Sequence, residues 1–372
     1  MKIPHLGPLS TMIKLPFLIR LRAHLEDKKL LRSLDPETTQ FRWKTGPRCP
    51  QKCVEGNRAL IGSYLFITGG YINDIATVSK KIFRLDMKTS RWTDLGQIPA
   101  GMPETHNAVI SDGQRHIFSV SGQLGAHCSP SVADCFVYDT QTRQWGFLPS
   151  LPEPRYMPLI QYYEGRIYCM GGSKPDRNTP ARECWSLGIQ DGQATENQWR
   201  PEFELPAGRT HTPCLIVNKK LYVFGGQAGD VPPINGSAEH LCNFDSPGDS
   251  VYDNVFSFDL ETQEYSELSP MPLRVSHTET AVLHIGDFVI IAGGTLDRAV
   301  TSDLVVCYNL SRDSWKIIGH LPYPMKKTVS AFHDGWFYIA TGQCAISKDD
   351  LRPGTVVDSV WKARLDFLFE SS

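Results

Sequence analysis

The sequence predicts an all-β protein built from six copies of one four-stranded antiparallel sheet, and two recurring patterns support this prediction. The first pattern is a short apolar run that ends in a pair of glycines or in a degenerate copy of that pair. The six copies read LFITGG, IFSVSG, YCMGG, LYVFGG, VIIAGG and FYIATG. The first residue of each pair stands at position 69, 121, 171, 225, 293 or 341, a period of about 50. Such a period indicates repeated sheet units within one domain.

The second pattern follows the pair and consists of an alternating strand, a turn with Asp or Asn, and an aromatic residue six positions later. Four copies show it: IFRLDMKTSRW, CFVYDTQTRQW, VFSFDLETQEY and VVCYNLSRDSW. The Asp or Asn side chain suits a turn because it caps the local backbone amides. The aromatic residue, namely Trp92, Trp145, Tyr265 or Trp315, is expected to fill the space between neighbouring sheets.

The glycine pair is interpreted as a structural element of the repeat. Glycines at the end of a second strand allow positive φ angles and a close approach of another backbone. A phosphate-binding loop is excluded because no helix follows the pair and no Lys-Ser/Thr accompanies it. Both patterns together are those of a kelch-type repeat, and six such sheets around one axis form a β-propeller.

We expect the ring to close through its N-terminal segment. The sixth copy reaches VWKARLDF, and no outer strand with an aromatic residue follows it. An unassigned stretch, TQFRWKTG with Trp43, precedes the first copy. Residues 40–45 are therefore expected to supply the outer strand of the sixth sheet, because an open ring would expose strand edges. The propeller would span residues 39–372, and residues 1–38 would form a loosely ordered or partly helical leader.

Composition and charge limit the classes of partner and the redox chemistry. The formal net charge of −2 does not indicate a nucleic acid partner. No apolar run of about 18 residues predicts a transmembrane helix, and the leader lacks the apolar core and cleavage site of a signal peptide. Cys169, Cys214 and Cys307 lie in strand patterns and are expected to be buried thiols. Six cysteines near loops would be able to form disulfides in an oxidising compartment: Cys49, Cys53, Cys128, Cys135, Cys242 and Cys344.

Several stretches carry a resemblance to a known family. They are VSGQLGAHC, LPEPRYMPLIQYYEGRIYCMGGSKPDRNTPARECWSL, DGQATENQWR, GGQAGD and GHLPYPMKK. With them the chain resembles kelch-repeat proteins of the galactose oxidase/kelch superfamily, over about residues 40–366. It is most similar to a plant group associated with the Golgi and endosomes, whose propeller faces the lumen behind one N-terminal membrane anchor. The resemblance implies a Golgi or endomembrane location, and because the leader has no anchor, a cytoplasmic location is the alternative.

Loops that lead into inner strands and loops that leave second strands share one face of a propeller, which makes this face the expected ligand site. Five of the six leading loops carry a cation: Arg48, Arg155, Arg209, Arg274 and Lys326. If these cations form a basic collar at the channel mouth, they would favour an anionic ligand through bidentate contacts. The alternative is that the arginines hold neighbouring sheets together through carbonyl or carboxylate groups.

Histidines and glutamines recur beside the proposed collar. Three leading loops carry His106, His211 and His277, and three of the leaving loops carry Gln123, Gln227 and Gln343. By topology His106 lies near Gln123, and His211 near Gln227. These groups suit hydrogen bonding to a sugar or a peptide, or else they satisfy backbone groups within their own sheets. A three-histidine metal site is less favoured, because the spacing does not show the convergence to about 2.1 Å that a metal requires.

The longest insertion, residues 227–250, lies on the same face and is a candidate lid or specificity loop. It contains the sequon Asn235-Gly236-Ser237, which makes Asn235 the predicted glycosylation site.

Three classes of function remain open. We favour a non-catalytic binding propeller that engages a protein, or an anionic or glycan ligand, and that needs no cofactor and no metal. An enzyme of the superfamily is the second class. It would be a galactose-oxidase-like copper protein using Tyr71, Tyr156 and His106, or a sugar epimerase or mutarotase using Glu104 with His106. The third is a substrate-receptor subunit, although the leader is too short for an adaptor domain.

Overall fold

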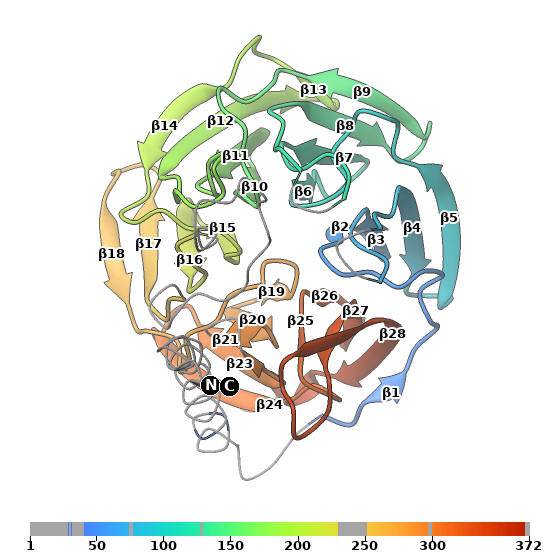
Figure 1. Cartoon of the computed structure of the whole chain (residues 1–372). Helices are drawn as coiled ribbons and strands as arrows, with labels where there is room; N and C mark the ends of the chain where they lie inside the picture. Colours follow the sequence, from blue (N-terminus) through green and yellow to red (C-terminus); the bar gives the residue numbers. More distant parts are fainter. Residues whose placement is uncertain are drawn as a thin grey trace, which may run out of the picture.

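Six sheets surround a central axis and form a β-propeller, as the repeat predicted (Figure 1). The computed structural model describes residues 29, 31, 41–73, 77–126, 129–229, 251–296 and 300–368. Within each blade, consecutive strands pair in antiparallel fashion from the axis outward. The apolar side chains pack mainly between neighbouring blades, and one such cluster joins Leu65 and Phe83 of blade 1 to Val329 and Tyr338 of blade 6.

The first three blades follow one another along the chain. Blade 1 contains β2 (Asn57–Ile61), β3 (Tyr64–Thr68), β4 (Lys81–Asp86) and β5 (Arg91–Gln97). Blade 2 contains β6 (Ala108–Ser111), β7 (His116–Val120), β8 (Cys135–Asp139) and β9 (Gln144–Leu148). Blade 3 contains β10 (Leu159–Tyr163), β11 (Arg166–Met170), β12 (Glu183–Gln190) and β14 (Arg200–Glu204), and a short extra strand, β13 (Gln193–Ala194), pairs with β12.

The other three blades complete the ring. Blade 4 contains β15 (Cys214–Val217), β16 (Lys220–Phe224), β17 (Val255–Asp259) and β18 (Tyr265–Leu268). Blade 5 contains β19 (Val282–Ile285), β20 (Phe288–Ala292), β23 (Leu304–Asn309) and β24 (Ser314–His320), with a hairpin of β21 (Thr295–Leu296) and β22 (Val300–Thr301). Blade 6 contains β26 (Val329–His333), β27 (Trp336–Ala345) and β28 (Pro353–Arg364), and β25 (Met325–Lys326) pairs with β27. The short 3₁₀ helix η1 (Asp366–Leu368) follows β28.

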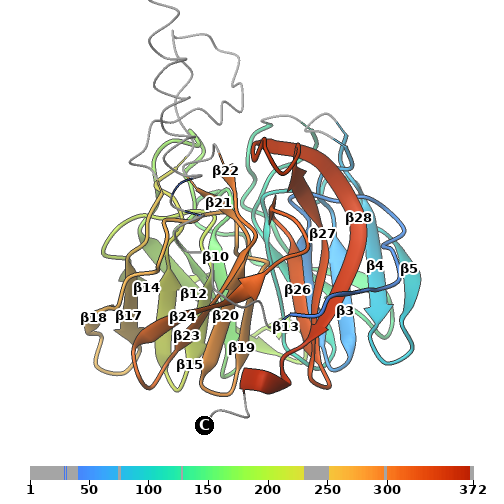
Figure 2. The same ribbon diagram turned by 90° about the horizontal axis from the view of Figure 1, so that it is seen from below.

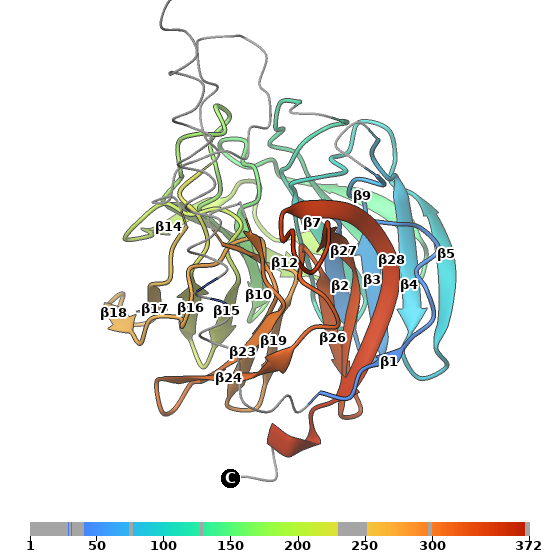
Figure 3. The same cartoon turned by 60° about the horizontal axis from the view of Figure 1, so that its bottom comes forward.

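The N-terminal segment closes the ring as expected. Strand β1 (Lys44–Thr45) pairs antiparallel with β28, Lys44 opposite Lys362 and Thr45 opposite Trp361. Figures 1 and 3 show β1 along the outer edge of β28. The indole of Trp43 donates a hydrogen bond of 2.7 Å to the carbonyl of His320 in blade 5. The closing segment is thus tied both to blade 6 and to the preceding blade 5.

The outer-strand aromatic residues join neighbouring blades. The indole N–H groups of Trp92, Trp199 and Trp315 donate to the carbonyls of Pro47, Pro149 and Ser269, at 2.9, 2.8 and 2.9 Å. Each accepting carbonyl lies at or near the outer edge of the preceding blade. In blade 3 this role belongs to Trp199, which the second sequence pattern missed because the β13 hairpin separates it from its turn.

The glycine pairs and their degenerate copies share one backbone conformation. A Cβ on Gly69 would lie 2.0 Å from the carbonyl oxygen of Glu104, so only glycine fits this crossing of the chain. Ser121 and Thr341, which replace the first glycine in two copies, keep a φ of 54°. The turn therefore follows the repeat even where the residue differs.

The ring has two faces of different construction. The hairpins within blades, such as β6–β7 and β8–β9, open on one side, here called the hairpin face. The loops into inner strands and out of second strands open on the other, here called the loop face (Figure 2). Of the predicted leader, Lys29 and Leu31 are described. Both are helical, and Leu31 is buried against a cluster of blades 4 and 5. Among the described residues, no helix has the length and apolar character needed to cross a membrane.

Candidate ligand-binding site at the propeller axis

Six residues occupy equivalent positions around the axis on the loop face, and we call them the axial ring. They are Glu55, His106, Met157, His211, His277 and Lys327, each with a φ between 42° and 60°. The residue before each pairs with the residue that follows the glycine pair, as Thr105 does with Gln123 and Thr210 with Gln227. Backbone hydrogen bonds run from the N–H of Met157 to the carbonyl of His106 at 2.7 Å, from His277 to His211 at 3.2 Å and from Lys327 to His277 at 3.1 Å. Positive φ at non-glycine residues is uncommon and often marks functional sites.

The three predicted histidines come together in this ring. The imidazoles of His211 and His277 stack with centroids 4.1 Å apart and planes at 11°. The ring of His106 lies 6.0 Å from that of His211 and is flanked by the rings of Tyr71 and Tyr156. Burial, followed by nearby cations, holds the pKa of His106 well below its ordinary value. His106 is therefore neutral at physiological pH.

A buried charged network adjoins the histidines. The ammonium of Lys327 lies 2.5 Å from Oε2 of Glu55 and also contacts Oε1 of Glu279. Glu279 in turn lies 3.0 Å from Nδ1 of His211. Burial alone would raise the pKa of Glu279, but Lys327 and His211 outweigh it and lower that pKa to about 2. The same carboxylates raise the pKa of Lys327 against the effect of its burial.

The two repeat patterns did not reveal this network, although the sequence carries a usable signal for it. Glu55 and Lys327 hold the same place in the backbone repeat as His106, His211 and His277. Glu55, His211 and Lys327 each stand 14 residues before the first residue of the glycine pair or its degenerate copy, and His106 and His277 stand 15 and 16 residues before theirs. Aligning the six copies on the glycine pair would have exposed Glu55 and Lys327, whereas aligning them on the cations did not.

A second chain of polar contacts extends across blades 1 to 3. Arg177 donates to Oε1 of Gln123 at 2.8 Å, and Nε2 of Gln123 donates to the hydroxyl of Tyr71 at 3.0 Å. The guanidinium of Arg177 also lies 4.2 Å above the ring of Tyr156. Arg177 is buried, and burial raises the pKa of Tyr71. The predicted Gln123 thus belongs to the site through Arg177, which the sequence pattern did not indicate.

One trio in the ring has donor atoms placed for a metal ion. Ligand atoms of Glu55, His211 and His277 all lie within 4.8 Å of one another. The ammonium of Lys327 is already 2.5 Å from the Glu55 carboxylate and supplies the positive charge there. A divalent ion bound by this trio would have to displace Lys327.

The five predicted cations do not occupy one equivalent place, so the collar was wrong as a geometric prediction. Arg155 and Arg209 precede the axial ring by two residues, whereas Arg274 precedes it by three, Lys326 by one and Arg48 by seven. The prediction aligned charged residues from loops of different length. Which residues are equivalent is instead set by the register of the backbone, and in that register the five cations fall at different positions.

The two buried arginines each find their side-chain partners in their own blade or in the loop that leads into it. Arg155 donates to Glu153 at 2.6 Å and to Glu183 at 3.1 Å, and its guanidinium lies 4.6 Å from the ring of Trp185. Arg209 donates to the carbonyl of Gly225 at 2.6 Å and to Oδ1 of Asn254 at 2.8 Å. Burial lowers the pKa of Arg209 to about 10. Both arginines thus bind carbonyl, carboxylate or amide groups, as the structural alternative expected, but these groups belong to the same blade and not to a neighbouring one.

The other three cations have separate surroundings. The side chain of Arg48 is 73% exposed and pairs with Asp358 at 2.5 Å. Arg274 is 52% exposed and lies 3.9 Å from Asp253. Lys326 is buried within β25, where it pairs with Gln343, whose amide donates to the carbonyl of Gly354 at 3.0 Å.

The remaining predicted residues also have separate surroundings, or lie outside the described part of the chain. Gln227 is buried between Thr210 and Val251. Glu104, the predicted acid/base partner of His106, accepts the N–H of Gly125 at 2.7 Å and lies 3.7 Å from Lys80. Asn235 and residues 230–250 of the candidate lid lie outside the described residues. The eight described cysteines carry free thiols, and Cys169, Cys214 and Cys307 are buried as expected.

Comparison with known proteins agrees with the repeat and with the ring. The family KLHDC2/KLHL20/DRC7 Kelch-repeats domain matches residues 55–277. The chain therefore belongs to the kelch-repeat β-propeller proteins, which generally act as protein-interaction modules. A kelch repeat-containing protein of Arabidopsis thaliana is 33% identical over 340 residues, covering 90% of this chain and 78% of that protein. The Kelch-like protein terF of Aspergillus terreus is 24% identical, over 81% of this chain and 64% of that protein.

A solved structure supports the fold. The structure of YjhT superposes with a TM-score of 0.64 at 16% sequence identity, covering 84% of this chain and 95% of that one. At this identity the likeness concerns the propeller architecture alone.

Proposed function

We propose that this propeller is a non-catalytic binding module that engages a protein or anionic glycan ligand on its loop face, at the axial ring. The observation that carries the proposal is the convergence there of buried polar side chains from several blades. His106, His211 and His277 share this place with the buried cations Arg177 and Lys327. The class to which the chain belongs supports a protein as the ligand.

The geometry suits the recognition of one polar group of a partner. The tyrosine hydroxyls, imidazoles and cations offer hydrogen-bond donors around a water-poor site, where each bond is stronger than in bulk water. Lys327 is held by two carboxylates, so an anionic group of the ligand has to compete with Glu55 and Glu279. Selectivity for a particular group would follow from this competition.

The test compares partners captured by the full chain and by two axial variants. Arg177→Gln removes a cation, and His106→Asn changes the imidazole while keeping a residue that tolerates positive φ. Lys88→Gln, an exposed change on the hairpin face, is the control. Partners captured from cell extracts are quantified by mass spectrometry, and the affinity of each purified partner is then measured. We expect the two axial variants to weaken binding at least about tenfold. Equal binding by all four proteins would refute the axial site.

We further propose a Golgi or endomembrane location, on the resemblance to the plant group described above. Microscopy of the tagged full chain together with a Golgi marker tests it. An even distribution through the cytoplasm would support the cytoplasmic alternative.

A carbohydrate-active enzyme is the second candidate, favoured by the contact between Glu279 and His211 beside Lys327. An acid and a base at this distance would be able to exchange protons with a sugar. NMR spectroscopy of reducing sugars with the full chain would show faster anomerisation or epimerisation if this activity exists. Absence of any rate increase supports the binding module.

A further inference from the structure

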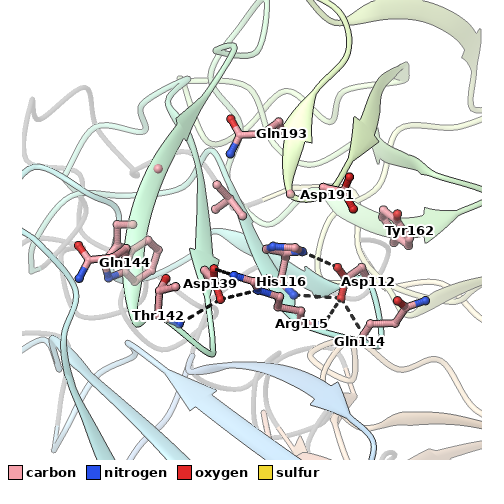
Figure 4. Close-up of a pocket in the computed structure, with 14 residues that line it drawn as sticks. Asp112, Gln114, Arg115, His116, Asp139, Thr142, Gln144, Tyr162, Asp191 and Gln193 are labelled. Carbon is pink, nitrogen blue, oxygen red and sulfur yellow. Dashed lines mark hydrogen bonds and ion pairs between the residues drawn. The ribbon is translucent and has the colours of Figure 1, made fainter.

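A cavity lies on the hairpin face, away from the axial ring, between blades 2 and 3 (Figure 4). Its volume is about 630 Å³, within the range of about 300–1,000 Å³ found for small-molecule sites. The β6–β7 turn and the β8–β9 turn of blade 2 form most of its lining, and the β12–β13 turn of blade 3 completes it. Neither the kelch repeat nor the proposed axial site requires this cavity.

An added hairpin of blade 3 builds one wall. The pairing of β12 with β13 extends past the region that pairs with β14. Glu196 braces this extension, because it accepts hydrogen bonds from Arg166 at 2.9 Å and from the N–H of Gly188 at 3.0 Å. Gly192 at its tip has a φ of 76°, and a Cβ there would lie 2.5 Å from the ring of His116. The hairpin therefore packs directly on blade 2.

His116 is fixed in orientation at the centre of the lining. One oxygen of Asp112 accepts the N–H groups of Gln114, Arg115 and His116, and the other lies 2.7 Å from Nδ1 of His116. These bonds to the carboxylate outweigh its burial and hold the pKa of Asp112 below its ordinary value. The carboxylate accepts the Nδ1 proton, so in the uncharged form of the ring Nε2 is a hydrogen-bond acceptor that faces the cavity lining. No described residue forms a hydrogen bond with that atom.

The strongest charges in the lining are neutralised by one another. Arg115 makes a bidentate pair with Asp139, at 2.9 and 2.5 Å. This guanidinium is the main cause that lowers the pKa of Asp139 well below its ordinary range. Of the lining carboxylates, that of Asp191 accepts no hydrogen bond from a described residue. The lining thus carries one carboxylate open to a ligand and no unpaired cation among the described residues.

Amide groups and aromatic rings make up much of the remaining surface. The side chains of Gln144 and Gln193 line the cavity without hydrogen bonds to described residues, and Tyr162 stacks on Phe118 at 5.7 Å. The indole of Trp145 also lines it. In blades 1, 3 and 5 the equivalent indole N–H donates to the preceding blade, but the indole N–H of Trp145 donates to no described residue.

We propose that this cavity binds a neutral saccharide unit. Uncharged amides, an imidazole acceptor and an indole donor match the alternating donors and acceptors of sugar hydroxyls, and Trp145 and Tyr162 offer apolar faces for a sugar ring. An anionic sugar is disfavoured because Asp112, Asp139 and Asp191 face a single arginine. This site is separate from the loop face, so the two proposals stand or fall independently.

Saturation-transfer NMR of the full chain with galactose, mannose and N-acetylglucosamine tests the proposal. The pocket variant carries Asp191→Asn and Gln193→Ala, two exposed positions where the fold tolerates a change. Glu264→Ala is the control, since Glu264 is an exposed residue of a blade 4 hairpin and does not line the cavity. Melting temperatures of all variants are compared with that of the wild type.

We expect at least one of the three sugars to bind, and the pocket variant to weaken its affinity at least about tenfold. The control and the axial variant Arg177→Gln should bind as the wild type does. A glycopeptide bearing the same sugar, used as a second probe, shows whether the free sugar or a protein-borne glycan is preferred. Three results overturn the proposal: no binding by any sugar at millimolar concentration, equal binding by the pocket variant, or loss of binding in Arg177→Gln. Preferential binding of N-acetyl-arginine amide at this cavity would assign it to a cationic protein side chain instead.

Discussion

Removal of the Trp43 side chain tests how much the closing strand stabilises the ring. Trp43 is half-buried, packs against Phe41 and Phe337 at 5.1 and 5.6 Å, and donates to the carbonyl of His320. A tryptophan buries about 200 Å² when packed, so Trp43→Ala exposes about half of that, worth about 2.5 kcal/mol at 25 cal/mol per Å². The lost hydrogen bond adds about 1 kcal/mol. We expect the free energy of unfolding to fall by about 3.5 kcal/mol.

Urea unfolding followed by far-ultraviolet circular dichroism measures this change, because that signal does not depend on tryptophan. Trp315→Ala is the matched control, since Trp315 is also half-buried and donates a similar bond to Ser269 from within a continuous blade. Similar losses in both variants would show that the closing strand acts as an ordinary outer strand. A loss below about 1 kcal/mol for Trp43→Ala, beside a full loss for Trp315→Ala, would refute the reasoning. Deletion of residues 40–45 should then also leave stability unchanged, instead of lowering it as we expect.

Three further outcomes follow from the structure. Gly69→Ala should lower the urea midpoint well beyond Gly62→Ala, because the new Cβ at Gly69 meets a carbonyl at 2.0 Å while that at Gly62 meets nothing within 4 Å. Arg209→Met should lower the free energy of unfolding by about 2–4 kcal/mol, because it leaves buried hydrogen-bond acceptors without donors. Arg274→Met, at an exposed position, should lower it by less than about 0.5 kcal/mol. Equal losses would contradict the structural role given to Arg209. The lowered pKa of Glu279 adds stability that is complete above its ordinary value of 4.5 and is lost as the pH falls toward about 2. Glu279→Gln should therefore make the urea midpoint depend less on pH between these two values. An unchanged slope would contradict this prediction.

The sequence predicted the blades because their signals are local. The glycine pair, or a degenerate copy of it, recurs in all six blades, and the six-residue spacing from Asp or Asn to an aromatic residue recurs in four of them. Closure was also predictable, since Trp43 was an aromatic residue without a repeat of its own. Blade 3 shows the limit: the β13 hairpin lengthens the path to Trp199, and a fixed spacing then fails.

The site was predicted less well because its members meet only in three dimensions. The histidines were found since they share a repeat position, but Arg177 reaches Gln123 from a loop of another blade. The path of this loop depends on its own turns. One of these turns is closed by the Asp176 carboxylate, which accepts the N–H groups of Asn178 and Thr179. No spacing in the sequence therefore indicates that Arg177 contacts Gln123.

The axial ring also separates what the fold needs from what a ligand would need. Its backbone bonds form whatever the side chain, as Met157 shows by occupying the same position and the same region of φ as His106. Placing Lys327 there with Glu55 instead incurs the desolvation of buried charges, and apolar replacements of such groups are often as stable or more so. The propeller therefore gains little stability from charge at this position. A ligand that contacts Lys327 would make use of a charge that the fold does not need. For this reason we place recognition at the axis.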